Sequence, residues 1–275
     1  MSSPSPKTEA GTGFVSPYLK MAYILCLIGG IGVAIVYAFQ GFYSEFMYDF
    51  SNVAPPFIAG VAVASSFFAL RRYWDYFGSR LSMIWLSFAL GMLLWFLGEV
   101  GWAYYTMVVG IEVPYPSIAD VFWLAGYLPL FLALLLYVEL FQPAISVRLF
   151  LLAGAIVGIV SALVFSSLMI PVLASASELD FVTLGISLAY TGLDLLLFLE
   201  AVLGLLVFTV TKLKGRLGKA WHFMNAAIFL TTLADMSFSY TTLDGSYFNG
   251  HPLEMLYHAS YLLFALAFFV HSKEL

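Results

Sequence analysis

The sequence is short of charge. Only 10% of its 275 residues are charged, whereas 62% are hydrophobic and the mean hydropathy is +0.96. A soluble domain carries roughly 25% charged residues, which keep its surface hydrated. A soluble fold of this size cannot bury so much apolar surface, so that surface must face lipid. The composition therefore excludes a soluble catalytic or nucleic-acid-binding domain and predicts an integral membrane protein.

Several reactive groups are also scarce. Cys26 is the single cysteine, which excludes an intramolecular disulfide and a cysteine-based metal site. No lysine falls in the interior of a predicted span, since Lys219 is only the first residue of the span 219–240, which excludes a retinal-type Schiff base. The chain has no Walker loop, no nucleophile elbow and no glycine-rich dinucleotide turn. We therefore expect no cofactor and no nucleic-acid partner, and an enzyme is the less favoured interpretation.

What the sequence does contain is a series of long apolar stretches. A helix needs about 20 mostly apolar residues to cross about 30 Å of hydrocarbon. Turn-forming residues separate the stretches at Pro55-Pro56, 114–117, Gln142-Pro143, Asp244-Gly245 and 249–252. We predict an all-α, polytopic membrane helix bundle with eight transmembrane helices. The expected spans are 21–39, 54–70, 82–106, 118–138, 149–172, 181–210, 219–240 and 253–271.

The basic residues predict how these spans are oriented. With eight spans and a cytoplasmic N-terminus, every Lys and Arg falls on the cytoplasmic side, which satisfies the positive-inside rule. These residues are Lys7, Lys20, Arg71, Arg72, Arg80, Arg148, Lys212, Lys214, Arg216, Lys219 and Lys273. We expect a multi-pass protein of the cell membrane with both termini in the cytoplasm. Residues 1–15 should be a disordered cytoplasmic segment, and residues 16–275 one membrane domain.

Two parts of the chain are similar to each other. When the sequence is shifted by 136 residues, Trp85 falls on Trp221 and Glu99 falls on Asp235. After a two-residue slip, Asp120 falls on Glu254 and Tyr127 falls on Tyr261. The alternative is chance similarity between apolar segments, but paired acids are rare in spans. The match predicts a parallel 4+4 internal repeat, with halves of about 16–142 and 143–275.

Acids inside the predicted spans are the candidate functional groups, because an ionised side chain in the bilayer centre costs about 2.5–3.5 kcal/mol on insertion scales. The predicted topology places four of them near the outer face, among aromatic residues. This arrangement predicts a polar, outward-facing pocket that binds a small molecule or a lipid. The candidate ligand-binding residues are Glu99, Trp102, Asp120, Tyr127, Asp194, Asp235, Glu254, His258 and Tyr261.

Structural roles compete with this interpretation. Ser117 and Asp120 form a capping box, and Glu254 lies in a first helical turn, where an acid complements the helix dipole. Glu99 and Asp235 lie towards helix C-termini, where a negative charge needs a partner. Asp194 is deeper and fits a protonated or hydrogen-bonded acid between helices; Glu200, six residues on, points in another direction. A metal site at His251, Glu254 and His258 is a weak alternative, because the spacing matches no established zinc motif.

The stretch from Val113 to Tyr127, preceded by Leu97 to Trp102, resembles the multi-helix membrane sensory regions that lie N-terminal to cyclase or histidine kinase domains in bacteria and archaea. The likeness covers mainly 82–138. It implies a sensory, ligand-receiving outer face. Because the given sequence ends at Leu275 without an output domain, a sensor of this kind is expected to act with a membrane or cytoplasmic signalling partner.

The region from Leu233 to Tyr240, together with Tyr257 and Tyr261, is similar to the acid-and-aromatic helices of the eight-span lysoplasmalogenase family. That resemblance implies a membrane-embedded lipid hydrolase with acid–base carboxylates. The full set of acids expected for that family is missing here. A proton-coupled secondary transporter and a structural subunit of a membrane complex are the remaining hypotheses. The sequence favours the ligand-binding or sensory module.

Overall fold

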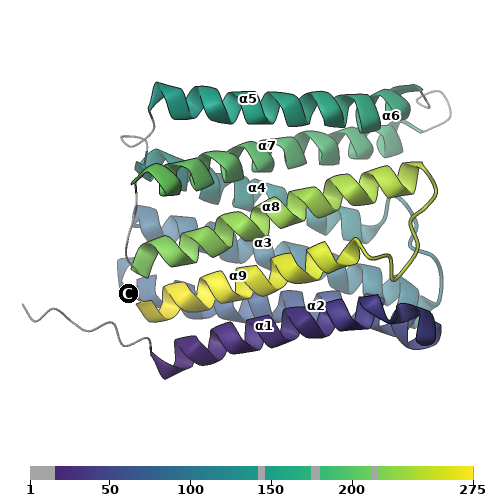
Figure 1. Ribbon diagram of the computed structural model, residues 1–275, viewed down its shortest axis with the longest axis horizontal. Coiled ribbons are helices and arrows are strands. Elements are labelled where there is room, and N and C mark those ends of the chain that lie inside the picture. The colour runs from purple at the N-terminus through teal and green to yellow at the C-terminus, as the bar shows by residue number, and fades with distance from the viewer. Residues whose placement is uncertain (1–15, 142–145, 175–179, 212–215, 275) are drawn as a thin grey trace, which may run out of the picture.

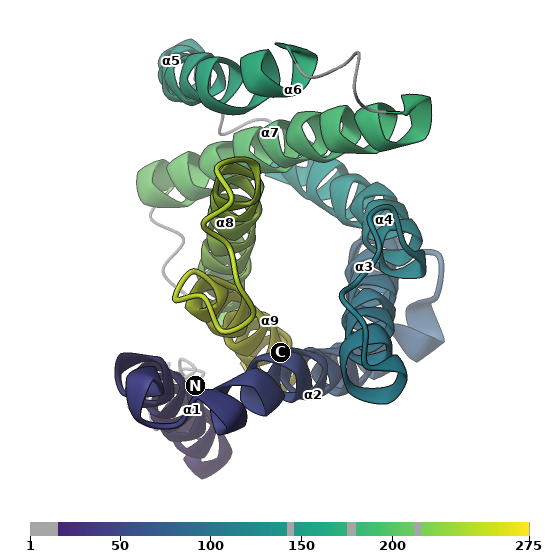
Figure 2. The same ribbon diagram turned by 90° about the vertical axis from the view of Figure 1, so that its right-hand side faces the viewer.

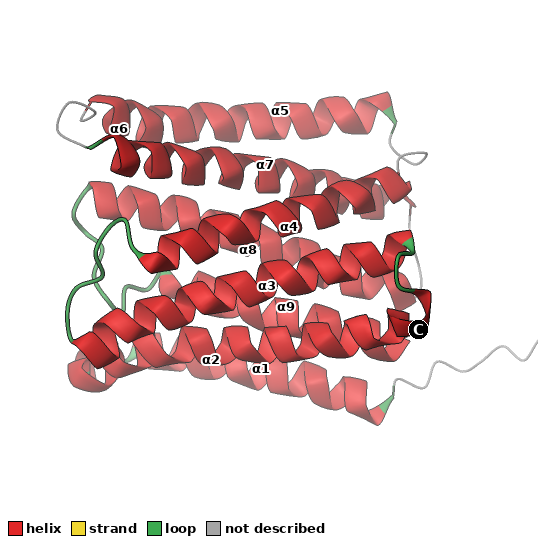
Figure 3. Ribbon diagram, turned by 180° about the vertical axis from the view of Figure 1, so that it is seen from behind, coloured by secondary structure: helices red, strands yellow, loops and turns green. Residues whose placement is uncertain are grey.

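The computed structural model describes residues 16–141, 146–174, 180–211 and 216–274, and all regular structure in these residues is helical (Figure 3). The long helices run back and forth along one bundle (Figure 1). The α-helices are α1 (Pro17–Ala38), α2 (Ser44–Leu70), α3 (Arg80–Ala103), α4 (Ile118–Phe141), α5 (Val147–Val164), α6 (Ile170–Ala174), α7 (Phe181–Thr211), α8 (Arg216–Leu243) and α9 (Glu254–Glu274).

Within the described residues, four shorter helical segments extend or connect these helices. The 3-10 segments η1 (Gln40–Phe42) and η2 (Arg71–Tyr76) lie before and after α2. The π-helical segments η3 (Tyr104–Val109) and η5 (Phe165–Met169) prolong α3 and join α5 to α6. α3 with η3, and α5 with η5 and α6, therefore each form one continuous helical rod.

Seven of the helices are long and apolar enough to cross a membrane, which identifies a multi-pass membrane protein. They correspond to α1, α2, α3, α4, α5 with α6, α7 and α9. The remaining long helix, α8, falls outside this group, because its 28 residues include charged and polar side chains such as Lys219, Asn225 and Asp235. It nevertheless runs the length of the bundle between α7 and α9 (Figure 1).

Six helices form a closed ring. α2 packs against α3, α3 against α4, α4 against α7, α7 against α8, α8 against α9, and α9 against α2 (Figure 2). α1 packs outside the ring on α9, and α5 packs outside it on α7. Buried side chains fill the ring, and the largest include Trp85, Phe88, Tyr137, Phe264 and Phe268. The ring is therefore a packed core.

The predicted break at Pro55-Pro56 is wrong. Both prolines lie inside α2, which begins at Ser44, ten residues before the predicted start at 54. Proline removes one hydrogen bond from the helix ladder, but neighbouring side chains and helices compensate in membrane helices. The carbonyls that Pro55 and Pro56 leave without a helix donor are those of Ser51 and Asn52, four residues before each proline. The side chains of these two residues donate to the carbonyl of Tyr48. The other predicted breaks at 114–117, 244–245 and 249–252 are confirmed as loops.

Glycine allows α3 and α4 to approach closely. A Cβ at Gly126 would lie 2.4 Å from the Trp95 ring, and a Cβ at Gly98 would lie 2.4 Å from the Trp123 ring. The Trp95 indole also donates to the carbonyl of Trp123 at 3.1 Å. In a membrane, where lipid competes equally for apolar surface, small residues at such a contact strengthen helix association through close packing.

The described basic residues lie at one end of the bundle. Each lies at the start of α1, α3, α5 or α8, in η2, or at the end of α9, and these places share the end where α1 begins and α9 ends (Figure 1). They are Lys20, Arg71, Arg72, Arg80, Arg148, Arg216, Lys219 and Lys273. Lys7, Lys212 and Lys214, residues 1–15 and the Gln142-Pro143 break lie outside the described residues. We call this the basic end, and the other the loop end.

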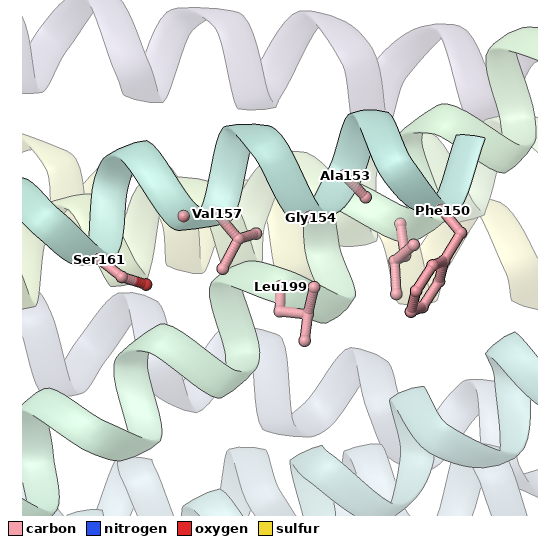
Figure 4. Close-up of a pocket in the computed structure, with 8 residues that line it drawn as sticks. Phe150, Ala153, Gly154, Val157, Ser161 and Leu199 are labelled. Atoms are coloured by element: carbon pink, nitrogen blue, oxygen red, sulfur yellow. The ribbon is translucent and has the colours of Figure 1, made fainter. Parts of the chain in front are cut away.

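Two apolar cavities lie beside α5. One, of about 310 Å³, lies between α5 and α7 and is bordered by Phe150, Gly154, Val157 and Leu199 (Figure 4). The other, of about 500 Å³, lies between the α5–η5 rod and α8. Neither cavity is bordered by a predicted site acid.

Candidate ligand-binding site

Glu99 and Asp235 come together inside the ring, near the loop end. Glu99 lies late in α3 and accepts a hydrogen bond from the Tyr261 phenol of α9 at 2.7 Å. Asp235 lies late in α8 and accepts from two phenols, Tyr257 at 2.7 Å and Tyr127 at 3.2 Å. These are the partners that an acid near a helix C-terminus requires.

Asp194 of α7 belongs to the same network. Its carboxyl accepts from the Tyr127 phenol at 2.5 Å. Because this phenol has a single proton, it shares that proton between Asp194 and the more distant Asp235, and the two carboxyl groups lie within hydrogen-bonding reach of each other. Two carboxyl groups this close cannot both be ionised without strong repulsion, because the surroundings have a low dielectric constant. The pair must therefore hold a proton or receive a positive charge. We call Glu99, Tyr127, Asp194, Asp235, Tyr257 and Tyr261 the central cluster.

Burial differs within the central cluster. Tyr127, Asp194 and Tyr261 are buried, whereas Glu99, Asp235 and Tyr257 are only partly buried. The exposure of these three residues belongs to the residue as a whole, because their carboxyl and phenol groups lie inside the ring.

Asp120 has two roles. One oxygen accepts from the backbone and hydroxyl of Ser117, at 2.7 and 3.0 Å, and the Ser117 hydroxyl accepts from the Ala119 amide. This confirms the predicted capping box. The other oxygen accepts from the Tyr190 phenol of α7 at 2.9 Å, and the Tyr190 ring lies 6.3 Å from the Tyr127 ring. Asp120 therefore both caps α4 and joins α4 to α7 beside the central cluster.

Glu254 lies apart, on the side of α1. It accepts from the phenols of Tyr37 and Tyr247, at 2.7 and 3.0 Å, and from the Gly250 amide at 2.9 Å. Gly250 has a left-handed backbone, with φ +91°, so the turn before α9 suits glycine. Three donors satisfy this carboxyl, and its observed role is to fasten the loop and α1 to the start of α9.

Trp102 and His258 lie outside the central cluster. The Trp102 indole donates to the Asn52 amide oxygen at 3.0 Å and packs on Trp123 and Phe238. His258 is fully buried, lies 2.7 Å from the Glu254 carbonyl and stacks on Phe50 of α2. The predicted site residues therefore divide into a central group, a capping group and these two packing residues.

The weak metal alternative gains nothing from the geometry. His251 precedes α9 and accepts from the Leu253 amide, while His258 faces α2. In the part of the chain that the structure describes, no group of three or more His, Cys, Asp or Glu side chains is arranged to hold a metal ion. The three residues therefore serve different parts of the fold.

Sequence reasoning missed the phenols that reach the acids from distant helices. Tyr37 on Glu254 and Tyr190 on Asp120 were not among the candidates. Tyr190 lies four residues before Asp194 in α7, a spacing that puts both side chains on one helix face. This spacing could have marked Tyr190 as a candidate site residue. Tyr37 gave no such signal. Glu200 is buried, and no described residue hydrogen-bonds its buried oxygen, so it stays outside the central cluster as expected.

The pKa shifts outside the spans concern surface turns. The hydroxyl and amide of Thr183 lower the pKa of Asp180, at the start of α7, and the side chain and amide of Ser246 lower that of Asp244. Both groups are fully exposed and form local turns, so they belong to the loops and not to the site.

Comparisons of the chain with models of known protein families, with curated protein sequences and with solved structures found no match. The two family resemblances seen in the sequence therefore stay expectations, and the case for function depends on the geometry of the central cluster.

Proposed function

We propose that α8 is an eighth membrane span. Its 28 residues give a length of about 42 Å at about 1.5 Å per residue, enough to cross the hydrocarbon layer. Its polar side chains are used inside the protein. Asn225 and Thr231 are buried and hydrogen-bonded, and Asp235 belongs to the central cluster. Lipid therefore need not accommodate them.

We further propose that the basic end faces the cytoplasm, which puts the loop end outside. The support is the gathering of the described Lys and Arg at one end, as the positive-inside rule requires. In a Cys26→Ser background, a membrane-impermeant maleimide applied to intact cells should label Ser246→Cys, at the loop end. It should label Asp75→Cys, in η2, only after the cells are opened. If only Asp75→Cys were labelled on intact cells, the basic end would face outwards and the proposed orientation would be wrong.

The parallel duplication is supported by corresponding contacts. In the alignment of the two segments, Glu99 corresponds to Asp235 and Tyr127 to Tyr261, so the bond from Tyr261 to Glu99 corresponds to the bond from Tyr127 to Asp235. At the basic end, the stack of His271 on Trp85 corresponds to that of Tyr137 on Trp221 in the same way. These matching pairs of contacts favour a duplication over chance similarity between apolar segments.

The function that the site supports best is binding of a small organic cation from the outer side. One observation carries this proposal: the central cluster collects three carboxyl groups inside a ring of phenols, and every described Lys and Arg lies at the opposite end. An ammonium group would neutralise the Asp194–Asp235 pair and lie against aromatic faces, which attract cations. The sensory resemblance adds that binding acts through a signalling partner.

Thermal unfolding of the purified protein tests this proposal. Ethylammonium and tetramethylammonium should raise the melting temperature more than sodium at equal ionic strength, because a ligand at 100 times its Kd stabilises by about 2.7 kcal/mol. The gain should be lost in Asp235→Asn and kept in Glu112→Gln, which changes an exposed loop acid. Equal shifts with sodium and the ammonium ions in the wild-type protein would refute cation recognition.

The hydrolase and transporter hypotheses have less support. A transport path would have to join the outer acids to Glu200, and Glu200 makes no hydrogen bond to the central cluster among the described residues. A hydrolase needs carboxylates reachable from the head-group layer, whereas Asp194 and Asp120 are buried and bonded to phenols. No specific observation favours either function over ligand binding.

A further inference from the structure

Five acids that are buried or partly buried in the bundle, Glu99, Asp120, Asp194, Asp235 and Glu254, share a feature that the sequence does not reveal. Take α1 to α4 as the first half of the protein and α5 to α9 as the second half. Each acid accepts a phenol from the opposite half. The pairs are Tyr261 on Glu99, Tyr190 on Asp120, Tyr127 on Asp194, Tyr127 on Asp235 and Tyr37 on Glu254.

The basic end is joined mainly by stacked rings, beside one hydrogen bond between the Tyr73 phenol of η2 and the His271 ring of α9 at 2.7 Å. There the two halves meet through close ring stacking: Trp85 lies 3.7 Å from His271, and Tyr137 lies 3.4 Å from Trp221, between ring centroids. Trp85 and Trp221 also contact each other at 5.2 Å. These rings are buried and make dispersion contacts that any separation of the helices would lose.

The two kinds of join respond differently to a polar ligand. A phenol on a carboxyl can be exchanged for water or for a ligand donor, because the carboxyl keeps a partner after the exchange. A buried aromatic stack has no such substitute. The phenol–carboxyl joins at the loop end are therefore replaceable. The halves also meet there through aromatic contacts, but these are wider, with ring centroids 5.8 Å apart for Phe50 and His258, 6.3 Å for Tyr127 and Tyr190, and 6.4 Å for Trp102 and Phe238. The close stacks at the basic end would lose more dispersion contact on separation.

From this contrast we infer that the protein opens at the loop end by releasing the phenol–carboxyl bonds between its halves, while the aromatic stack at the basic end acts as the hinge. The central latches are the Tyr261 phenol on Glu99 and the Tyr127 phenol, which is shared between Asp194 and Asp235, since each half gives one phenol to the other. The inference rests on the proposed ligand-binding function in one respect only: the bound ligand is what would drive the opening. It assigns Tyr127 and Tyr261 a role as latches, in addition to any contact with a ligand.

The chain offers a matched control. Tyr257 also donates its phenol to Asp235, at 2.7 Å, but it lies in α9, in the same half as α8. Tyr257→Phe therefore removes a phenol from the same carboxyl without cutting a join between the halves. Tyr127→Phe with Tyr261→Phe removes the same chemical group from both latches.

Distances between spin labels test the inference. In a Cys26→Ser background, one pair of labels goes on Glu112→Cys and Ser246→Cys, exposed positions in loops of the two halves at the loop end. A second pair goes on Asp75→Cys and Lys273→Cys, exposed positions at the basic end. In the double latch variant, the loop-end distance should lengthen by several ångströms and broaden, while the basic-end distance stays unchanged. In Tyr257→Phe both distances should match the parent protein.

Two results would overturn the inference. If the loop-end distance changes as much in Tyr257→Phe as in the latch variant, the phenols are ordinary packing contacts. If both distances broaden together, the variant has loosened as a whole and the basic end is not a hinge. Because no ligand is added, failure here leaves the ammonium-binding experiment unaffected, and failure of ammonium binding leaves the latches unaffected.

Discussion

Gly126→Ala should destabilise the protein by about 1–3 kcal/mol, the usual cost of overpacking a buried contact. The added methyl group would lie 2.4 Å from Cδ1 and 2.7 Å from Nε1 of the Trp95 ring. That ring cannot retreat easily, because it is 2% exposed and its indole is hydrogen-bonded to the carbonyl of Trp123. Either the indole loses this bond or α4 moves away from α3. Thermal unfolding in detergent measures the loss.

Gly154→Ala is the matched control for this substitution. It adds the same methyl group to a glycine in the middle of a membrane helix, at a position with nothing within 4 Å (Figure 4). Alanine is the better helix former by about 0.8–1.0 kcal/mol, so this variant should be neutral or slightly more stable. Equal melting temperatures for Gly126→Ala and the wild-type protein would mean that α3 and α4 are not in close contact.

The helices could be predicted from the sequence because membrane solvation leaves the backbone few choices. Apolar stretches of sufficient length must be helical in lipid, so most predicted spans agree with the observed helices within a few residues. The error at Pro55-Pro56 comes from the same physics: a rule derived from soluble helices treats proline as a break, whereas a membrane helix can retain it.

The acids of the site could also be predicted, because their cost in lipid makes them stand out among apolar neighbours. Their partners could not. Tyr37 lies 217 positions from Glu254, and Tyr261 lies 162 positions from Glu99. Such pairs depend on which helices are neighbours in the ring. Tyrosines are common in apolar spans. Their spacing in the sequence does not show which of them pack only as rings and which donate a hydrogen bond to an acid. The ring order of the helices was the missing information.

Glu254→Ala should strongly destabilise the protein, and this result would distinguish a structural role of Glu254 from a ligand-binding role. The substitution leaves the Tyr37 phenol and the Gly250 amide without acceptors, and both residues are buried. Each buried donor left unpaired costs about 1–3 kcal/mol. The loss should appear in thermal unfolding and as faster hydrogen exchange in residues 244–253, since the carboxyl holds that loop. Glu254→Gln keeps an oxygen acceptor and should lose less.

Glu45→Ala provides the control for this effect. Glu45 is also an acid in the first turn of a helix at the loop end, in α2, but it is exposed. Removing it tests what an acid contributes through the helix dipole alone, which is about 0.3–1 kcal/mol at an exposed site. If Glu254→Ala costs no more than Glu45→Ala, then Glu254 does not hold the loop and α1 together. Its carboxyl would then be available to a ligand, and the outer site would have to be extended from the central cluster towards α1.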